Sequence, residues 1–225
     1  MTPDQARDAA AWLYRMLGER GLIVGSAGNV SARTLEGMVI TPSGGSPGEV
    51  GPADLVHVTL AGTELERAPP ETDAPLPSSE WAMHAAVYRT CSEAAFVAHT
   101  HADACAALAC LNERLPPFHY MVAQFGGDDV RCAPYVTFGT PALAQLAGDA
   151  ILGRTACLLA NHGMIVCATG VAEALSSATL LETLCRQYLF ARSAGTPRLL
   201  TEQEMLEARE RFKTYGARRQ NQGIM

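Results

Sequence analysis

The chain contains the stretch AAFVAHTH at residues 94–101, an apolar run that ends in two histidines. Five apolar residues in succession predict a buried β-strand, and residues two apart in a strand point to the same face. His99 and His101 are therefore expected side by side at the end of this strand. Two neighbouring imidazoles in a buried place are costly to keep without a partner, and a metal ion is the simplest partner.

Two further residues complete a candidate ligand set. His162 lies in the turn Asn161-His162-Gly163 between two apolar strands, and Glu80 lies in the first turn of a predicted helix. Three histidines and one carboxylate suit a tetrahedral site for Zn²⁺, or for another divalent ion such as Mn²⁺ or Co²⁺. Each residue alone is more often structural, so the joint pattern carries the hypothesis. His84 is expected on the same helix face as Glu80, which makes it a further candidate ligand, although a supporting or structural role beside the site is favoured.

Outward from residues 94–101, apolar periodicity predicts a single α/β domain in which helices cover a mixed sheet. We expect this domain over residues 1–216 and a flexible C-terminal tail over 217–225. The expected strands are 30–33, 37–40, 55–60, 94–98, 130–135, 156–160 and 164–168. The expected helices are 4–21, 77–89, 103–111, 141–151, 171–194 and 201–215.

The composition excludes several classes of function. A formal net charge of −6 argues against general binding to nucleic acid or anionic membranes. No apolar run approaches the ~20 residues of a membrane span, and the N-terminus lacks the pattern of a signal peptide. The seven cysteines are scattered and odd in number, which indicates reduced thiols in a cytoplasmic protein.

The basic residues constrain the chemistry further. The chain has sixteen arginines but one lysine, Lys213, which lies in a charged segment near the C-terminus. Schiff-base catalysis requires a desolvated lysine, so carbon–carbon chemistry in this protein is expected to use a metal as the electron sink.

Three short loops form a second candidate constellation. They are Gly28-Asn29, Ser43-Gly44 and Ser78-Ser79. Glycines allow close backbone approach, hydroxyl and amide side chains donate hydrogen bonds, and the serines at 78 and 79 are expected to open a helix whose N-terminus suits an anion. Together these loops could hold a phosphate group without a lysine, although each loop alone is also explained by turn chemistry and helix capping.

The chain resembles the class II aldolase/adducin family. The segments that carry the resemblance are GSAGNVS (25–31), ITPSG (40–44), PSSEW (77–81), HTH (99–101), HYM (119–121), CAPY (132–135), FGT (138–140), NHG (161–163) and FKTYG (212–216). They follow one another in order over nearly the whole chain. The resemblance implies a three-layer α/β/α domain with a largely antiparallel sheet, and a homotetramer with active sites between subunits.

The resemblance also implies roles for individual residues. His99, His101 and His162 would hold Zn²⁺, with Glu80 on the metal at rest and acting on the carbon-bound proton during the reaction. The phosphate of a ketose 1-phosphate would be held by Asn29, Ser43, Gly44, Ser78 and Ser79. Tyr120 would donate a proton from a neighbouring subunit, assisted by Tyr215. The implied reaction is retro-aldol cleavage of L-fuculose 1-phosphate, or a related deoxy-ketose phosphate, to dihydroxyacetone phosphate and an aldehyde.

Three alternatives remain open from the sequence. An L-ribulose-5-phosphate 4-epimerase or a methylthioribulose-1-phosphate dehydratase would belong to the same family. A non-catalytic, adducin-like scaffold would keep the fold but is expected to lose the histidines, all of which are present here.

Overall fold

The centre of the structure is one seven-stranded sheet with the strand order β3-β2-β1-β4-β7-β6-β5. The computed structural model describes residues 1–65 and 74–214. The strands are β1 (Gly28–Arg33), β2 (Met38–Ile40), β3 (Val56–Val58), β4 (Phe96–Thr100), β5 (Cys132–Ala133), β6 (Ala156–Leu159) and β7 (Gly163–Ala168). All neighbouring strands are antiparallel except β5 and β6, which are parallel, so the predicted mixed and mostly antiparallel sheet is confirmed.

Strand β4 occupies the middle of the sheet, and all five of its residues are buried. It pairs with β1 on one side and β7 on the other, and the register places His99 opposite Asn29 and opposite Ile165. A strand buried on both faces reads as a continuous apolar run, which is why the segment stands out in the sequence. His101 follows the last residue of β4 directly.

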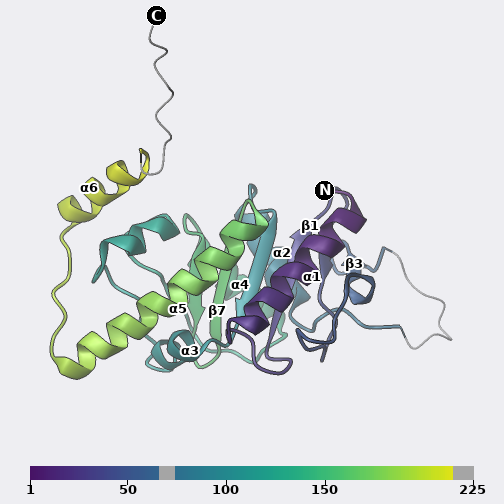
Figure 1. Cartoon of the computed structure of the whole chain (residues 1–225), viewed down its shortest axis with the longest axis horizontal. Helices are drawn as coiled ribbons and strands as arrows, with labels where there is room; N and C mark the ends of the chain where they lie inside the picture. Colours follow the sequence, from purple (N-terminus) through teal and green to yellow (C-terminus); the bar gives the residue numbers. More distant parts are fainter. Residues whose placement is uncertain (66–73, 215–225) are drawn as a thin grey trace, which may run out of the picture.

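Helices cover both faces of the sheet, which confirms the three-layer architecture (Figure 1). One face carries α1 (Pro3–Glu19), α3 (Asp103–Ala109) and α5 (Val171–Ala194), and the other carries α2 (Trp81–Thr90) and α4 (Pro141–Ile151). Alternate residues of β4 join different cores: Ala98 packs with the α1 side, whereas Val97 packs with the α2 side. Because side chains alternate along a strand, His99 faces the α2 side.

Some element bounds differ from the sequence prediction. The strand expected over 130–135 is the two-residue β5, and the strand expected over 55–60 is β3. Short edge strands lack the two-sided pairing that sustains β4. A 3₁₀-helix η2 (Tyr120–Phe125) was not predicted, and a further one, η1 (Pro52–Asp54), precedes β3. The predicted tail 217–225 lies outside the described residues.

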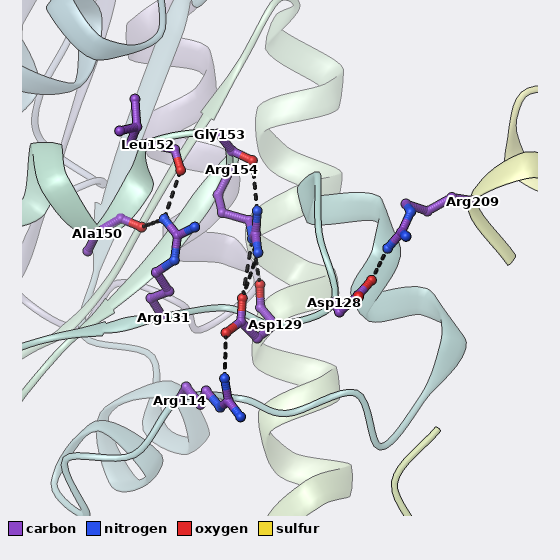
Figure 2. Close-up of polar contacts among 9 residues, drawn as sticks. All are labelled: Arg114, Asp128, Asp129, Arg131, Ala150, Leu152, Gly153, Arg154 and Arg209. Carbon is purple, nitrogen blue, oxygen red and sulfur yellow. Dashed lines mark hydrogen bonds and ion pairs between the residues drawn. The ribbon is translucent and has the colours of Figure 1, made fainter. Parts of the chain in front are cut away.

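Helix α6 (Glu202–Phe212) lies apart from the sheet and packs on η2 (Figure 1). Figure 2 shows how the loop after η2 is fixed: Asp128 pairs with Arg209 of α6, and Asp129 pairs with Arg114 and Arg154 at 3.1 and 2.9 Å. The same loop thus contacts both α6 and Arg154, which lies just before β6. This network sets the position of the segment that carries Tyr120.

A buried carboxylate on α5 caps the start of α3. Glu182 is 3% exposed and accepts backbone N–H bonds from Ala104 at 3.0 Å and Cys105 at 2.9 Å. The residue before α3, Ala102, has no side chain that could satisfy these groups, and helix N-termini leave such donors unpaired. Glu182 therefore fixes the helix that begins two residues after His101.

We expect Glu182→Ala to lower the free energy of unfolding by roughly 1–3 kcal/mol, since it leaves buried N–H groups unpaired. Thermal unfolding at fixed protein concentration measures the change. The control Glu207→Ala removes an exposed carboxylate of α6 and should cost less than about 0.5 kcal/mol. Equal stability of the two variants would contradict the capping role.

All seven cysteines are free thiols, as the sequence indicated. In the two described ranges, no helix is both long enough and apolar enough to cross a membrane.

Candidate metal and substrate site

Four of the predicted site residues meet at the end of β4. Potential ligand atoms of Glu80, His99, His101 and His162 all lie within 4.8 Å of one another. The Nε2 atom of His99 is 3.0 Å from Nε2 of His101 and 3.3 Å from Oε2 of Glu80, and Nε2 of His162 is 3.4 Å from Oε1 of Glu80. Two ligand atoms of a tetrahedral zinc site are separated by about 3.3 Å. The donor set and its spacing therefore fit a divalent ion.

Close backbone approach brings His162 beside the pair from β4. A Cβ atom on Gly163 would lie 2.3 Å from the carbonyl oxygen of Thr100, so only glycine lets the β6–β7 turn press against β4. Asn161, in the same turn, has a φ of 53°, a left-handed conformation that asparagine tolerates better than most residues. The three imidazole rings stand edge-on, with centroids 4.7–4.8 Å apart, around a common point.

A hydrogen bond fixes the tautomer of His99. Its Nδ1 atom lies 2.8 Å from the carbonyl oxygen of Met164, which can only accept, so Nδ1 carries the proton. The lone pair is then on Nε2, which faces the cluster. A metal-binding histidine usually donates its other N–H to a carbonyl or carboxylate in this way.

Burial keeps two of the histidines in the form that binds metals. Burial, together with the repulsion from His99 when that ring is protonated, lowers the pKa of His101 and of His162 to about 4. Both imidazoles are therefore neutral near pH 7. Burial raises the pKa of Glu80, but the charge that His99 carries when its Nε2 is also protonated and the hydrogen bond from Asn29 outweigh burial, so the pKa lies below its usual range.

One carboxylate oxygen in the cluster is unsatisfied. Oε1 of Glu80 is buried and has no hydrogen-bond partner among the described residues. Most buried polar atoms have a partner, and an orphaned one indicates a missing ligand or a functional role. Since Oε1 lies 3.4 Å from Nε2 of His162 and belongs to the cluster of possible ligands, a cation is the partner that its chemistry favours.

A cavity of about 380 Å³ opens beside this cluster. It is lined by Glu80, His101 and His162 and by all five residues predicted to hold a phosphate: Asn29, Ser43, Gly44, Ser78 and Ser79. The sequence thus named residues that the fold brings to one place. No lysine or arginine is found among the described residues that line the cavity, so the cavity offers neutral donors to an anion.

Two of the loops are held together by backbone hydrogen bonds. The N–H of Ser43 donates to the carbonyl of Leu76 at 2.9 Å, and the N–H of Ser78 donates to the carbonyl of Thr41 at 3.1 Å. This pairing corrects one expectation, that the serines open a helix. Helix α2 begins at Trp81, the residue after Glu80, and the serines lie in the turn before it.

The amide of Asn29 is already hydrogen-bonded at both ends. Its Nδ2 atom donates to Oε2 of Glu80 at 2.9 Å, and its Oδ1 atom is 2.5 Å from Nε2 of His84. His84 is thus a buried neighbour of the site, outside the four-residue cluster. A phosphate contact by the Asn29 side chain would have to compete with these bonds.

The two predicted tyrosines lie elsewhere. Tyr120 is 51% exposed, stacks between His119 and Phe212, and does not line the cavity of its own chain. Tyr215 lies outside the described residues. The lining residues Tyr135, Val136 and Phe138 received no role from the sequence, although the motifs CAPY and FGT contain two of them.

Comparison with known proteins agrees with this geometry. The profile described as Class II Aldolase and Adducin N-terminal domain matches residues 8–189. The chain belongs to this family. The predicted family and enzyme class are confirmed, because aldolases of this family match most of the chain.

Three relatives illustrate the similarity. A 5-methylthioribulose-1-phosphate/5-deoxyribulose-1-phosphate aldolase from Rhodospirillum rubrum is 41% identical, over 87% of this chain and 86% of its own. An L-fuculose phosphate aldolase from Escherichia coli is 39% identical, over 88% and 89%. A solved structure of L-fuculose 1-phosphate aldolase superposes with a TM-score of 0.86 at 36% identity, over 93% of this chain and 96% of that one.

Proposed function

We propose that this class II aldolase uses Zn²⁺ to cleave a ketose 1-phosphate to dihydroxyacetone phosphate and an aldehyde. The observation that carries the proposal is a single cavity lined both by the histidine–glutamate cluster and by the hydroxyl- and glycine-rich loops. The cluster suits a divalent ion, and the loops suit a phosphate. By their names, one relative acts on 5-methylthioribulose 1-phosphate and 5-deoxyribulose 1-phosphate, and the other acts on L-fuculose phosphate. These names support a phosphorylated ketose as the substrate class.

Glu80 would act on the proton at carbon. His99, His101 and His162 would hold the ion, which supplies Lewis-acid stabilisation of negative charge on the ketose oxygens when bound. Cleavage breaks the bond between C3 and C4, the C4 hydroxyl loses its proton, and C3 gains one. Oε1 of Glu80, which has no hydrogen-bond partner among the described residues, would take up a proton from solvent and deliver it to C3, while the proton of the C4 hydroxyl leaves through Tyr120; in the reverse condensation the ionised carboxylate would accept the proton from C3.

The phosphate would be held by hydroxyl and backbone groups. The Oγ atom of Ser78 accepts the N–H of Glu80 at 3.3 Å, which leaves its own proton available for a phosphate oxygen. Ser43, Gly44 and Ser79 line the same cavity. Asn29 would contribute its side chain only if one of its present bonds is released.

The far end of the substrate is proposed to be apolar. Tyr135, Val136 and Phe138 line the cavity together with the polar loops. The sugar named for one relative ends in a methyl or methylthio group, and L-fuculose also ends in a methyl group. L-fuculose 1-phosphate and 5-deoxyribulose 1-phosphate are therefore the first substrates to test.

Product analysis by NMR tests the proposal. The purified metal-loaded protein is incubated with each ketose 1-phosphate and with L-ribulose 5-phosphate, and the chelator-treated protein is the control. We expect dihydroxyacetone phosphate and an aldehyde from the metal-loaded protein alone. An isomerised pentulose phosphate without triose phosphate would indicate the epimerase, and loss of water without carbon–carbon cleavage would indicate the dehydratase. A protein without bound metal or turnover would favour the scaffold.

Tyr120 is proposed to transfer the proton at the oxygen of C4 in the site of a neighbouring subunit of a homotetramer: it would take up the proton of the C4 hydroxyl on cleavage and donate it to the aldehyde oxygen in the reverse reaction. Its exposure, and its absence from the cavity of its own chain, support a role in another copy. We expect Tyr120→Phe to lower kcat by about 10²-fold or more while metal content stays unchanged.

A mixing experiment separates a role across subunits from a role within one. Glu80→Gln and Tyr120→Phe chains, each nearly inactive, are co-expressed with different tags and purified as hybrids. In a ring in which each site uses the cluster of one subunit and Tyr120 of the next, about a quarter of the sites are intact. Activity should therefore return to about that fraction. Hybrids as inactive as the parents would contradict the shared site.

A further inference from the structure

A line of buried polar side chains leads from Glu80 through Asn29, which also lines the cavity, to residues outside the cavity lining. Asn29 and Ser31 are two residues apart on β1, and His84 and Tyr88 are four apart on α2, so the strand and helix spacings place each pair on one face. These four residues are 5%, 0%, 0% and 0% exposed. We call them the buried polar chain.

Their contacts are continuous from Tyr88 to Glu80. Tyr88 Oη lies 2.9 Å from Ser31 Oγ, which lies 2.7 Å from Nδ1 of His84. Nε2 of His84 lies 2.5 Å from Oδ1 of Asn29, whose Nδ2 donates to Oε2 of Glu80 at 2.9 Å. The nearest polar groups to His84 are therefore those of Asn29 and Ser31.

The chemistry of the groups sets one direction for these hydrogen bonds. An ionised carboxylate only accepts, so Asn29 must turn its NH₂ group to Glu80 and its carbonyl to His84. His84 must then carry its proton on Nε2, and Nδ1 must accept from Ser31. Ser31 in turn accepts from Tyr88. Burial lowers the pKa of His84 to about 3 and raises that of Tyr88, so both are neutral, as this pattern requires.

We propose that His84 is a positioning residue: through Asn29 it holds Oε2 of Glu80, and so presents Oε1 as the oxygen that serves the metal site and the reaction. If the Asn29 amide turned over, its carbonyl oxygen would face a carboxylate oxygen, and neither could donate. His84 prevents this, because the protonated Nε2 accepts no hydrogen bond from an NH₂ group. The inference rests on the proposed function only in the proton-transfer role given to Glu80.

Two substitutions of His84 test this. His84→Phe fills the space but removes the donor, so Asn29 can turn over. We expect kcat to fall by about tenfold or more, with KM changed less than about twofold and with metal still bound. His84→Gln keeps an N–H donor near the Nε2 position and should hold kcat within about threefold of the wild type.

A matched control removes a buried histidine outside the site. His57 is 3% exposed and lies 3.0 Å from Oγ1 of Thr34. We expect His57→Phe to lower the melting temperature about as much as His84→Phe and to leave kcat unchanged. A purely structural role of His84 would make the two variants alike in kcat, and would overturn the proposal.

The visible absorption of the Co²⁺-loaded protein gives a readout that does not need turnover. The spectrum reports the geometry of the ligands, so His84→Phe should alter it and His84→Gln should not. The double variant Glu80→Gln/His84→Phe should have the same Co²⁺ spectrum as Glu80→Gln alone. Its residual kcat should lie within about twofold of that of Glu80→Gln, because the two residues act through one contact.

The outcomes separate the two proposals. If no ketose 1-phosphate is cleaved, the proposed function fails, yet the Co²⁺ spectra still test whether His84 positions Glu80. If the wild type cleaves its substrate and His84→Phe keeps both the wild-type kcat and the wild-type spectrum, the positioning role is wrong while the function stands.

Discussion

Replacing His99 with alanine is expected to remove metal and aldolase activity together. The ring is fully buried, its Nδ1–H is donated to Met164, and its Nε2 lies within 3.3 Å of both His101 and Glu80. Loss of a group that only supports a metal ligand costs about 10–100-fold. Loss of the ligand itself should therefore lower cleavage by about a thousandfold or more, and bound metal to a small fraction of one ion per subunit.

Metal analysis by mass spectrometry after dialysis, together with a cleavage assay, measures this effect. Because the alanine leaves a hole in the core, His162→Ala provides a second variant at a more accessible ring of the same cluster. Both variants should lose metal, whereas His57→Ala, outside the cluster, should keep it. If His99→Ala and His162→Ala are folded and bind metal as tightly as the wild type, the assigned ligand set is wrong.

Glu80→Gln is expected to separate metal binding from proton transfer. Glutamine has the same shape and can still approach the ion through its carbonyl oxygen, so three histidines should retain most of the metal. The amide cannot carry the proton that C3 gains on cleavage, and loss of a general acid–base group lowers turnover by about 10²–10⁴-fold. We therefore expect kcat to fall in that range while the metal content per subunit changes little.

The comparison of Glu80→Gln with Glu80→Asp distinguishes charge from position. Aspartate keeps the carboxylate but withdraws it by one methylene, so it should retain more activity than glutamine if the negative charge is what matters. Cleavage by Glu80→Gln at the wild-type rate would refute the assignment of the base. Complete loss of metal from Glu80→Gln would instead make Glu80 chiefly a structural ligand.

The position of the histidine pair could be predicted from short sequence patterns. The strand ending at His99 and His101 was predicted because β4 is buried on both faces and therefore apolar throughout. Turn chemistry likewise placed His162 correctly between β6 and β7. The start of α2 was predicted four residues early, because the capping preference of Ser78 and Ser79 was outweighed by pairing of their loop with residues 41–43.

The contacts of the buried polar chain could not be predicted from short sequence patterns. His84 was expected to have a supporting or structural role beside the site, but nothing near it in the sequence names Asn29 or Ser31 as its partners. That contact depends on α2 packing over β1, across more than fifty residues of chain. The apolar side of the cavity was missed for the same reason, since Tyr135, Val136 and Phe138 follow an edge strand with no periodic signal.

The sequence by itself determined the kinds of groups available and the elements that carry them. Apolar periodicity, glycine and asparagine turns and the His-x-His spacing each involve a few neighbouring residues, and the scarcity of lysine is a matter of composition. All of these features can therefore be recognised in the sequence alone.

Tertiary structure alone decided the distances between the site residues. The register of β4 between β1 and β7, and the close approach of Gly163 to Thr100, join residues far apart in sequence into one cluster. They also leave one oxygen of Glu80 held by Asn29 and the other unsatisfied. Such contacts depend on packing between distant segments, which no local pattern specifies.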